Sequence, residues 1–240
     1  MDFSYNDYEK LINLISGSGY TFCNYHNYEH YDNCVILRHD VDQSIEKAYE
    51  LACLEHKIGV CSTWFVLLRT DFYNVATTKS LRLIKEMQSM GHEIGLHFDE
   101  MAYSNNSNTV ENIINEASIL SHIIETPVTT VSMHRPSKKT LDANYSIPHI
   151  VNSYGETFFN NFKYLSDSRR HWREPIEDIV KSKKYNRLHI LTHAIWYSDE
   201  CQGMKETIKE FVERAKYERY ESMKDNIRDL ESVIRIEEIQ

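Results

Sequence analysis

The chain has few of the residues that interrupt regular structure. Its 240 residues include only seven glycines and four prolines, which excludes collagen-like and low-complexity chains. Apolar residues make up 41% of the sequence, enough for a hydrophobic core. A chain of this length buries enough surface to fold without disulfides or a structural metal. We therefore expect a folded globular protein in which residues 1–240 form one domain.

Long hydrophobic runs are also missing. The longest uninterrupted apolar run, Trp64–Leu68, is five residues long, whereas a helix needs about 20 such residues to cross a bilayer. The first residues show neither the basic segment nor the apolar segment of a secretory signal. We expect no integral membrane segment and a cytoplasmic location.

Excess positive charge and paired cysteine motifs are absent too. Lys and Arg number 27 against 36 Asp and Glu, a net charge of −9, so we expect no nucleic-acid partner. The five cysteines are odd in number and form no Cys-x-x-Cys motif, which predicts reduced thiols. By contrast, the chain has 12 histidines. Because imidazole binds metals and transfers protons near neutral pH, the positions of these histidines carry the functional signal.

Hydrophobic periodicity predicts strands that alternate with helices. Strands are expected at 34–37, 60–68, 92–97, 128–133 and 188–192, with weaker candidates at 147–154 and 158–165. Helices are expected at 7–16, 44–56, 79–90, 110–124 and 175–181. This alternation indicates an α/β fold around a parallel sheet, either open or closed into a barrel. Residues 203–236 predict a C-terminal helical extension that packs on the body, with dimerisation as the less favoured alternative.

Histidine and aspartate gather where the predicted strands end, the place where α/β folds build their active sites. These residues are His39, Asp40, Asp42, His97, Asp99, His134 and His193, with Arg135 beside them. In an extended segment Asp40 and Asp42 face the same way, which suggests a general base next to a metal ligand. Strand alternation places His92 and His97 on opposite faces, so we expect His92 to be a buried, hydrogen-bonded residue.

Five motifs occur in an order that resembles a known family. They are Leu37-Arg-His-Asp-Val-Asp42, Gly91-His-Glu-Ile-Gly-Leu-His97, His134-Arg-Pro136, Asp167 followed by Trp172, and Leu191-Thr-His193. The series is similar to that of NodB-type polysaccharide deacetylases, carbohydrate esterase family 4, and most similar to a branch found among genes for surface polysaccharides. The resemblance covers residues 34–197. It implies a distorted (β/α)7 barrel and hydrolysis of an acyl amide on a sugar, assisted by a divalent metal, commonly zinc.

The resemblance also implies roles for individual residues. Asp40 matches the general base, and Asp42 and His97 match metal ligands. Met101 stands where the family has its second histidine ligand, so the third ligand must come from elsewhere. The candidates are His134, Asp99 and Glu100, of which we favour His134 because imidazole is a good zinc ligand. A site that works without metal is the alternative.

Three further residues complete the expected catalytic set. Arg135 matches the position of an arginine that would hold Asp40 through charge-assisted hydrogen bonds. His193 matches the general acid that protonates the leaving amine. Asp167 would orient either His193 or Arg135.

Three residues are candidates for substrate contacts. Trp172 and Trp196 are expected either to wall the acyl or sugar pocket or to pack in the core. His39 is expected either to donate to a neighbouring carboxylate or to touch the substrate.

The sequence thus predicts an enzyme that removes an acetyl or other short acyl group from an N-acylated sugar. Because no signal peptide is visible, we expect a small-molecule, nucleotide-linked or lipid-linked sugar precursor of a surface polysaccharide as substrate. One alternative is a metal-independent amide or ureide hydrolase of the same fold. The other is a catalytically silent sugar-binding homologue. A homo-oligomer is compatible with the sequence.

Overall fold

The computed structural model describes residues 2–104 and 108–239. The chain divides into two compact units, Met1–Glu200 and Cys201–Gln240, each of which contacts mainly itself. From the sequence we predict one domain over residues 1–240, with a C-terminal helical extension over residues 203–236. Each unit is described by itself.

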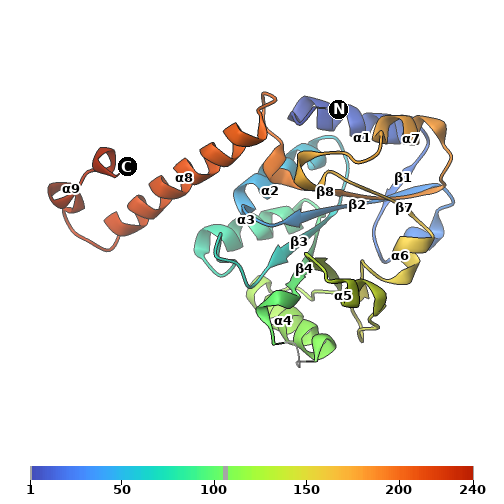
Figure 1. Cartoon of the computed structure of the whole chain (residues 1–240), viewed down its shortest axis with the longest axis horizontal. Helices are drawn as coiled ribbons and strands as arrows, with labels where there is room; N and C mark the ends of the chain where they lie inside the picture. The colour runs from blue at the N-terminus through green and yellow to red at the C-terminus, as the bar shows by residue number, and fades with distance from the viewer. Residues whose placement is uncertain (1, 105–107, 240) are drawn as a thin grey trace. The chain divides into compact units, whose positions relative to one another are not determined.

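A parallel sheet organises the first unit (Figure 1). Its main path has the order β6-β5-β4-β3-β2-β8-β7, and β1 pairs with the first half of β2. The strands are β1 Thr21–Cys23, β2 Cys34–Val41, β3 Thr63–Leu67, β4 Glu93–Asp99, β5 Thr130–His134, β6 Val151–Asn152, β7 Lys163–Ser166 and β8 Arg187–Thr192. The sheet forms a half-barrel with helices around it, which confirms the predicted α/β fold of the distorted (β/α)7 type.

Apart from α1, which precedes the first strand, the helices of this unit lie between strands in sequence, as expected for βαβ units. They are α1 Tyr5–Gly17, α2 Ile45–Lys57, α3 Thr78–Ser89, α4 Thr109–Ile124, α5 Lys138–Asp142, α6 Glu156–Asn160 and α7 Ile176–Ser182. Side-chain oxygens cap the amino ends of the longer ones. Ser44, for example, accepts a hydrogen bond from the Lys47 amide at 3.2 Å, which confirms the predicted start of α2.

Two predicted strands are much shorter than expected. The region 147–154 contributes only β6, and the region 158–165 contains helix α6 before β7 begins at Lys163. The Phe159 ring, in α6, lies 5.3 Å from the Tyr154 ring beyond β6 and 5.7 Å from the Tyr164 ring of β7. Aromatic packing therefore links the two ends of the half-barrel, in the region where two longer strands were predicted.

Strand alternation produces two separate apolar clusters. In β2, Val35 and Leu37 belong to the larger cluster, which includes the apolar faces of the helices, while Ile36 belongs to a smaller one. In β3, Trp64 joins the larger cluster and Phe65 the smaller. Because neighbouring side chains of a strand point to opposite faces, the smaller cluster fills the concave side of the sheet and the larger one its outer side.

His189 of β8 is a buried titratable group in contact with the smaller cluster. Its Nε2 lies 2.7 Å from the Tyr25 hydroxyl, and its ring packs against those of Phe158 and Phe162. Burial, reinforced by the Arg38 guanidinium, lowers the pKa of His189 well below its ordinary value. The imidazole is therefore neutral in the folded protein.

This burial predicts a pH dependence of stability. Below about pH 6.5 the unfolded chain protonates this histidine and the folded chain does not, so stability falls as the pH is lowered. His189→Gln should reduce the slope of stability against pH by about 0.7 kcal/mol per pH unit at pH 6.5, and by about 1.4 kcal/mol per pH unit near pH 5. Urea unfolding of both proteins at several pH values measures it, and identical slopes would contradict the prediction.

The second unit is helical, as predicted for residues 203–236. It contains α8 Met204–Lys224 and α9 Leu230–Val233. Tyr220 and Leu230 are buried, and the Tyr220 hydroxyl donates to the Ile234 carbonyl at 2.8 Å.

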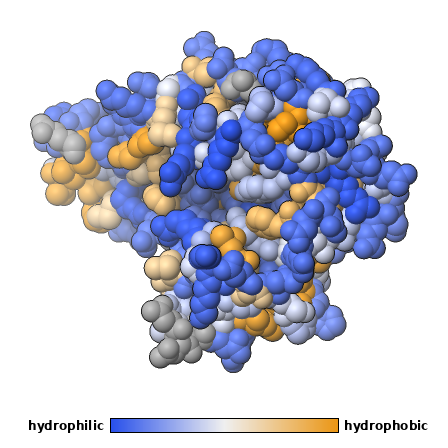
Figure 2. Space-filling view, turned by 45° about the vertical axis from the view of Figure 1, so that its right-hand side comes forward, coloured by the Kyte–Doolittle hydropathy of each residue, from blue (hydrophilic) through white to orange (hydrophobic). Residues whose placement is uncertain are grey.

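Within residues 2–104 and 108–239, no helix combines the length and apolar character that a membrane crossing requires. Figure 2 shows a face of the molecule on which hydrophilic residues predominate, in keeping with the mean hydropathy of −0.54.

Candidate active site

The predicted functional side chains come from the carboxyl ends of four strands. Asp40 lies at the end of β2 and Asp42 directly after it, His97 lies in β4, His134 ends β5, and His193 follows β8. Since the strands are parallel, their carboxyl ends share one edge of the half-barrel. The pairing of β4 with β5 places Asp99 opposite His134.

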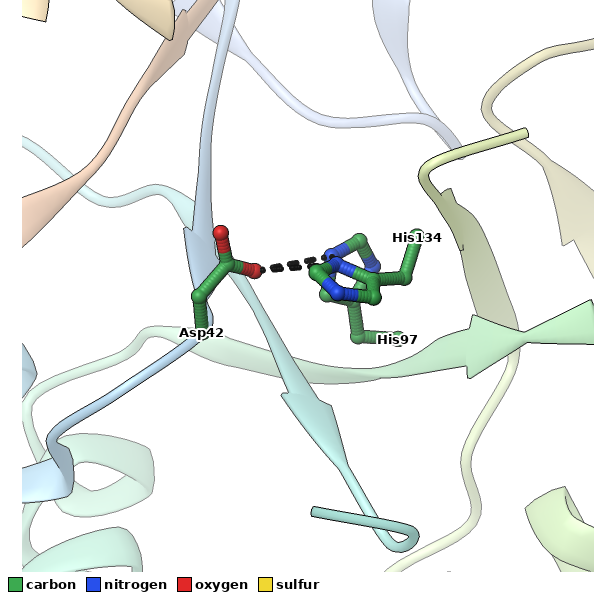
Figure 3. Close-up of side chains that lie close together, drawn as sticks. All are labelled: Asp42, His97 and His134. Atoms are coloured by element: carbon green, nitrogen blue, oxygen red, sulfur yellow. Dashed lines mark hydrogen bonds and ion pairs between the residues drawn. The ribbon is translucent and has the colours of Figure 1, made fainter. Parts of the chain in front are cut away.

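Three of these residues form a compact donor set (Figure 3). One carboxylate oxygen of Asp42, Oδ1, lies 3.2 Å from His97 Nε2 and 3.2 Å from His134 Nδ1. The two imidazole nitrogens are 3.1 Å apart. The three atoms are therefore the corners of a nearly equilateral triangle.

This triangle fits a divalent metal ion. Ligand atoms about 2.1 Å from a tetrahedral zinc ion lie about 3.4 Å apart, close to the spacing here. Asp42 Oδ1 is buried and accepts no hydrogen bond from the described residues. The Nδ1–H of His97 donates to the Ser132 carbonyl at 3.3 Å, so the lone pair of its Nε2 faces the triangle. Three protein ligands with room for a water is also the arrangement of catalytic zinc sites.

The electrostatics favour a charged carboxylate at this position. Burial alone would raise the pKa of Asp42, but the imidazoles of His134 and His97 outweigh it and lower the pKa below its ordinary value. Asp42 is thus ionised at neutral pH, the form that binds a metal.

The other candidates for the third ligand have different partners. Asp99 accepts hydrogen bonds from the Met101 amide at 3.0 Å and from Arg135 at 2.9 Å. The Glu100 carboxylate accepts from Ser137 and from the Thr140 hydroxyl, at the start of α5. Of the three candidates, His134 is the one whose nitrogen completes the triangle.

Asp40 lies beside this donor set. Its Oδ2 is 3.7 Å from His97 Nε2, and its side chain is 5% exposed. The fully buried Arg38 donates from one nitrogen to both Asp40 oxygens, at 3.0 and 2.7 Å. The same guanidinium donates to the Ser132 and Ser153 hydroxyls, at 2.7 and 2.8 Å. Arg38 therefore fixes Asp40 to β5 and to the end of β6.

This arrangement corrects the role predicted for Arg135. Its side chain is 69% exposed and pairs with Asp99 at 2.9 Å, while the guanidinium on Asp40 belongs to Arg38. Strand β5 ends at His134, and Arg135 has a φ of 46°, so the chain turns sharply there. The signal for Arg38 is nonetheless in the sequence, because residues two apart in a strand share a face.

His193 is held by Asp167, one of the two predicted alternatives. The Asp167 carboxylate, itself fully buried, accepts from His193 Nδ1 at 2.6 Å and from the His193 backbone amide at 3.1 Å. The Tyr197 hydroxyl also donates to it, at 3.2 Å. His193 Nε2 then lies 3.9 Å from Asp42 Oδ2. Asp167 thus directs the second imidazole nitrogen towards the donor set.

The charge state of His193 follows from the same contact. Burial alone would lower the pKa of this imidazole, but the Asp167 carboxylate outweighs it and raises the pKa to about 9. His193 is consequently protonated at neutral pH and can donate a proton.

His39 does not face the site, so its predicted contact with substrate is wrong. Since it alternates with Arg38 and Asp40 along β2, its ring lies on the outer side of the sheet. There it is fully buried and stacks on Trp64 at 3.8 Å. Its Nε2 donates to Glu55 at 2.9 Å and its Nδ1 hydrogen-bonds with Thr192 at 2.6 Å. The second predicted role, an interaction with a neighbouring carboxylate, is the one observed.

The pair of His39 and Glu55 should matter for stability. His39→Ala removes one hydrogen-bond donor to the buried Glu55 carboxylate, while the Tyr8 and Ser62 hydroxyls still donate to it. We therefore expect the free energy of unfolding to fall by about 1.5–3 kcal/mol. Denaturant unfolding measures this loss. The exposed His30 provides the control, since His30→Ala should leave stability nearly unchanged. Equal effects of the two substitutions would contradict the structural role.

His92 and the two tryptophans are all at least partly buried. His92 is buried, and its Nε2 donates to the Ala52 carbonyl at 3.1 Å, as predicted. Trp172 and Trp196 are half-buried and pack against the larger apolar cluster. Their core-packing alternative is therefore observed, and their contact with a sugar stays a prediction.

Comparisons with known proteins find similarity only among solved structures. No protein-family model matches the chain, and no curated protein matches it either. A family 4 carbohydrate esterase from Bacillus anthracis has a TM-score of 0.46 and 14% identity, over 85% of this chain and 86% of that one. A deacetylase described as involved in O-antigen biosynthesis, from Bordetella bronchiseptica, has a TM-score of 0.41 and 14% identity, over 72% and 76%.

A third similar structure is a family 4 pseudoenzyme from Bacillus anthracis. Its TM-score is 0.45 and its identity 15%, over 77% of this chain and 62% of the pseudoenzyme. A mutant described as having restored activity is matched over 64% of its length. This chain thus spans less than two thirds of these two solved chains. A functional proposal has to rest on the geometry of the site.

Proposed function

We propose that this protein is a metal-dependent hydrolase that removes an acetyl or other short acyl group from the nitrogen of an acylated sugar. The observation that carries the proposal is the convergence of an Asp-His-His donor triangle with two proton-transfer groups, Asp40 and His193, at one edge of the half-barrel. Amide hydrolysis needs this combination, because water must lose a proton and the leaving nitrogen must gain one.

Asp42, His97 and His134 would hold the metal, for which zinc suits one carboxylate and two imidazoles. When bound there, the metal polarises the amide carbonyl and lowers the pKa of a water molecule. Asp40 accepts the proton of the attacking water, and Arg38 keeps its carboxylate in place beside the triangle. His193, protonated and oriented by Asp167, donates to the nitrogen of the amide. The products are a short carboxylic acid and a free amino sugar.

For the substrate we propose a cytoplasmic sugar precursor of a surface polysaccharide, linked to a nucleotide or a lipid. The resemblance of the motifs to the surface-polysaccharide branch of family 4 supports this choice.

A panel of N-acylated sugars tests the proposal. The purified protein is incubated with free, nucleotide-linked and lipid-linked sugars, with zinc and with a chelator, and released acid is measured. We expect acid release from at least one sugar and its loss with chelator. Release that survives complete metal removal would favour the metal-independent hydrolase. Sugar binding without release from any substrate would favour the silent homologue.

A further inference from the structure

One loop at the carboxyl edge of the sheet is unusually basic. Residues 168–173, here named the basic loop, follow β7 and contain Arg169, Arg170, His171, Trp172 and Arg173. Three arginines in six residues stand out in a chain with a net charge of −9. The net negative charge disfavours a long polyanion such as nucleic acid, but a single phosphate needs only one or two guanidinium groups.

The basic loop begins directly after a residue of the candidate site. Asp167, which holds His193, precedes it, and the Asp167 carbonyl accepts from the His171 amide at 3.2 Å. Consecutive Cα atoms are 3.8 Å apart, so the Cα of Arg169 lies within about 8 Å of that of Asp167. A long arginine side chain at this position can reach a group attached to a sugar whose amide lies at His193.

The charges of the loop are available for a ligand. Arg169 and Arg173 are exposed and form no ion pair within the part of the chain that the structure describes. The adjacent Glu174 does not neutralise them, since Lys163 binds its carboxylate at 2.6 and 2.7 Å. Arg170 instead packs over the Phe3 ring at 4.8 Å and anchors the loop to the body.

The backbone of the loop is also unusual. Arg169 has a φ of 60° and Arg170 a φ of 56°, in the left-handed region that residues with a side chain avoid. Strain of this kind concentrates at ligand-binding sites, where the surrounding structure maintains it. Here it accompanies the turn between Arg169, which is exposed, and Arg170, which packs over Phe3.

We propose that the basic loop binds a phosphate or diphosphate group attached to the substrate sugar. This inference rests on the proposed function for the location of the sugar, and it assigns the residues that bind the phosphate of the carrier. The planar guanidinium groups of Arg169 and Arg173 match phosphate oxygens in pairs. Nucleotide and lipid carriers share this diphosphate chemistry, so the experiment must separate them.

Binding measurements on a catalytically impaired protein test the inference. Zinc-loaded Asp40→Asn protein is titrated with N-acetylglucosamine, its 1-phosphate, UDP-N-acetylglucosamine, and the polyprenyl-diphosphate-linked sugar in detergent. We expect the phosphate-bearing sugars to bind about tenfold or more tightly than the neutral sugar. The tighter of the two diphosphate carriers identifies the source of the phosphate. Adding Arg169→Gln and Arg173→Gln should abolish the preference.

Lys57→Gln is the control. Lys57 is exposed and ends α2, the helix that leads into β3. It therefore lies near the amino end of β3, at the edge of the sheet opposite the candidate site. The substitution removes one positive charge and should leave all affinities unchanged. Circular dichroism verifies that each variant is folded. Equal binding of neutral and phosphorylated sugars, or a preference that survives loss of both arginines, would overturn the inference even if acid release is observed. A phosphate preference without acid release from any sugar would instead refute the proposed function and leave the basic loop's role standing.

Discussion

Asp40→Asn is expected to lower kcat/KM for the acylated sugar by about 10²–10⁴-fold, the usual contribution of a general base, while zinc stays bound. Asparagine keeps the size of the side chain and can still accept a hydrogen bond from Arg38, but it cannot take a proton from water. Asp40 is not a corner of the donor triangle, so the metal content should be unchanged. Acid release and zinc per chain are measured on the same preparation.

Asp32→Asn is the control for this substitution, since Asp32 is exposed and lies before the start of β2. It should change neither quantity. If Asp40→Asn lost its zinc together with its activity, Asp40 would have to be a ligand. If it kept full turnover, another group would have to be the base.

His193→Gln should produce a loss of similar size, about 10²–10⁴-fold, but only for substrates that need a proton on the leaving group. An amide nitrogen must be protonated to leave, whereas the phenolate of p-nitrophenyl acetate leaves without one. We therefore expect a large loss of sugar deacetylation and a much smaller loss of p-nitrophenyl acetate hydrolysis. Both rates are measured on the same zinc-loaded variant.

The comparison of the two substrates separates proton donation from structural damage. Equal losses on the amide and the ester would show that His193 is needed for another reason, such as the shape of the site. His122→Gln changes an exposed histidine of α4 and should affect neither substrate.

Much of this site could be predicted because its residues obey strand geometry. Parallel strands bring their carboxyl ends to one edge, so Asp42, His97, His134 and His193 could be assigned to one place from the positions where strands end. The period of two placed Asp40 and Asp42 on the same side of the chain.

The errors concern two side chains of β2 and the short elements β6 and α6. Asp40 is bonded by Arg38 of its own strand, an arrangement that the period of two allows but does not require. His39 lies on the outer side because it alternates with Arg38 and Asp40 along β2. The helical spacing of Ala48, Leu51 and Glu55 likewise places Glu55 on the buried face of α2, where it meets His39. Both patterns are in the sequence, but a buried glutamate on an apolar stripe is read by default as exposed. The short elements β6 and α6 depend on aromatic contacts between the ends of the half-barrel, which periodicity does not reveal.

Zinc bound per chain, measured by elemental analysis after dialysis against a low zinc concentration, tests most directly whether Asp42, His97 and His134 form a metal centre. The parent protein should hold one zinc ion, Asp42→Ala and His134→Ala should hold almost none, and Asp99→Ala should keep it. The assignment would be contradicted if Asp42→Ala still held one zinc ion. It would also be contradicted if Asp99→Ala lost the ion while His134→Ala kept it.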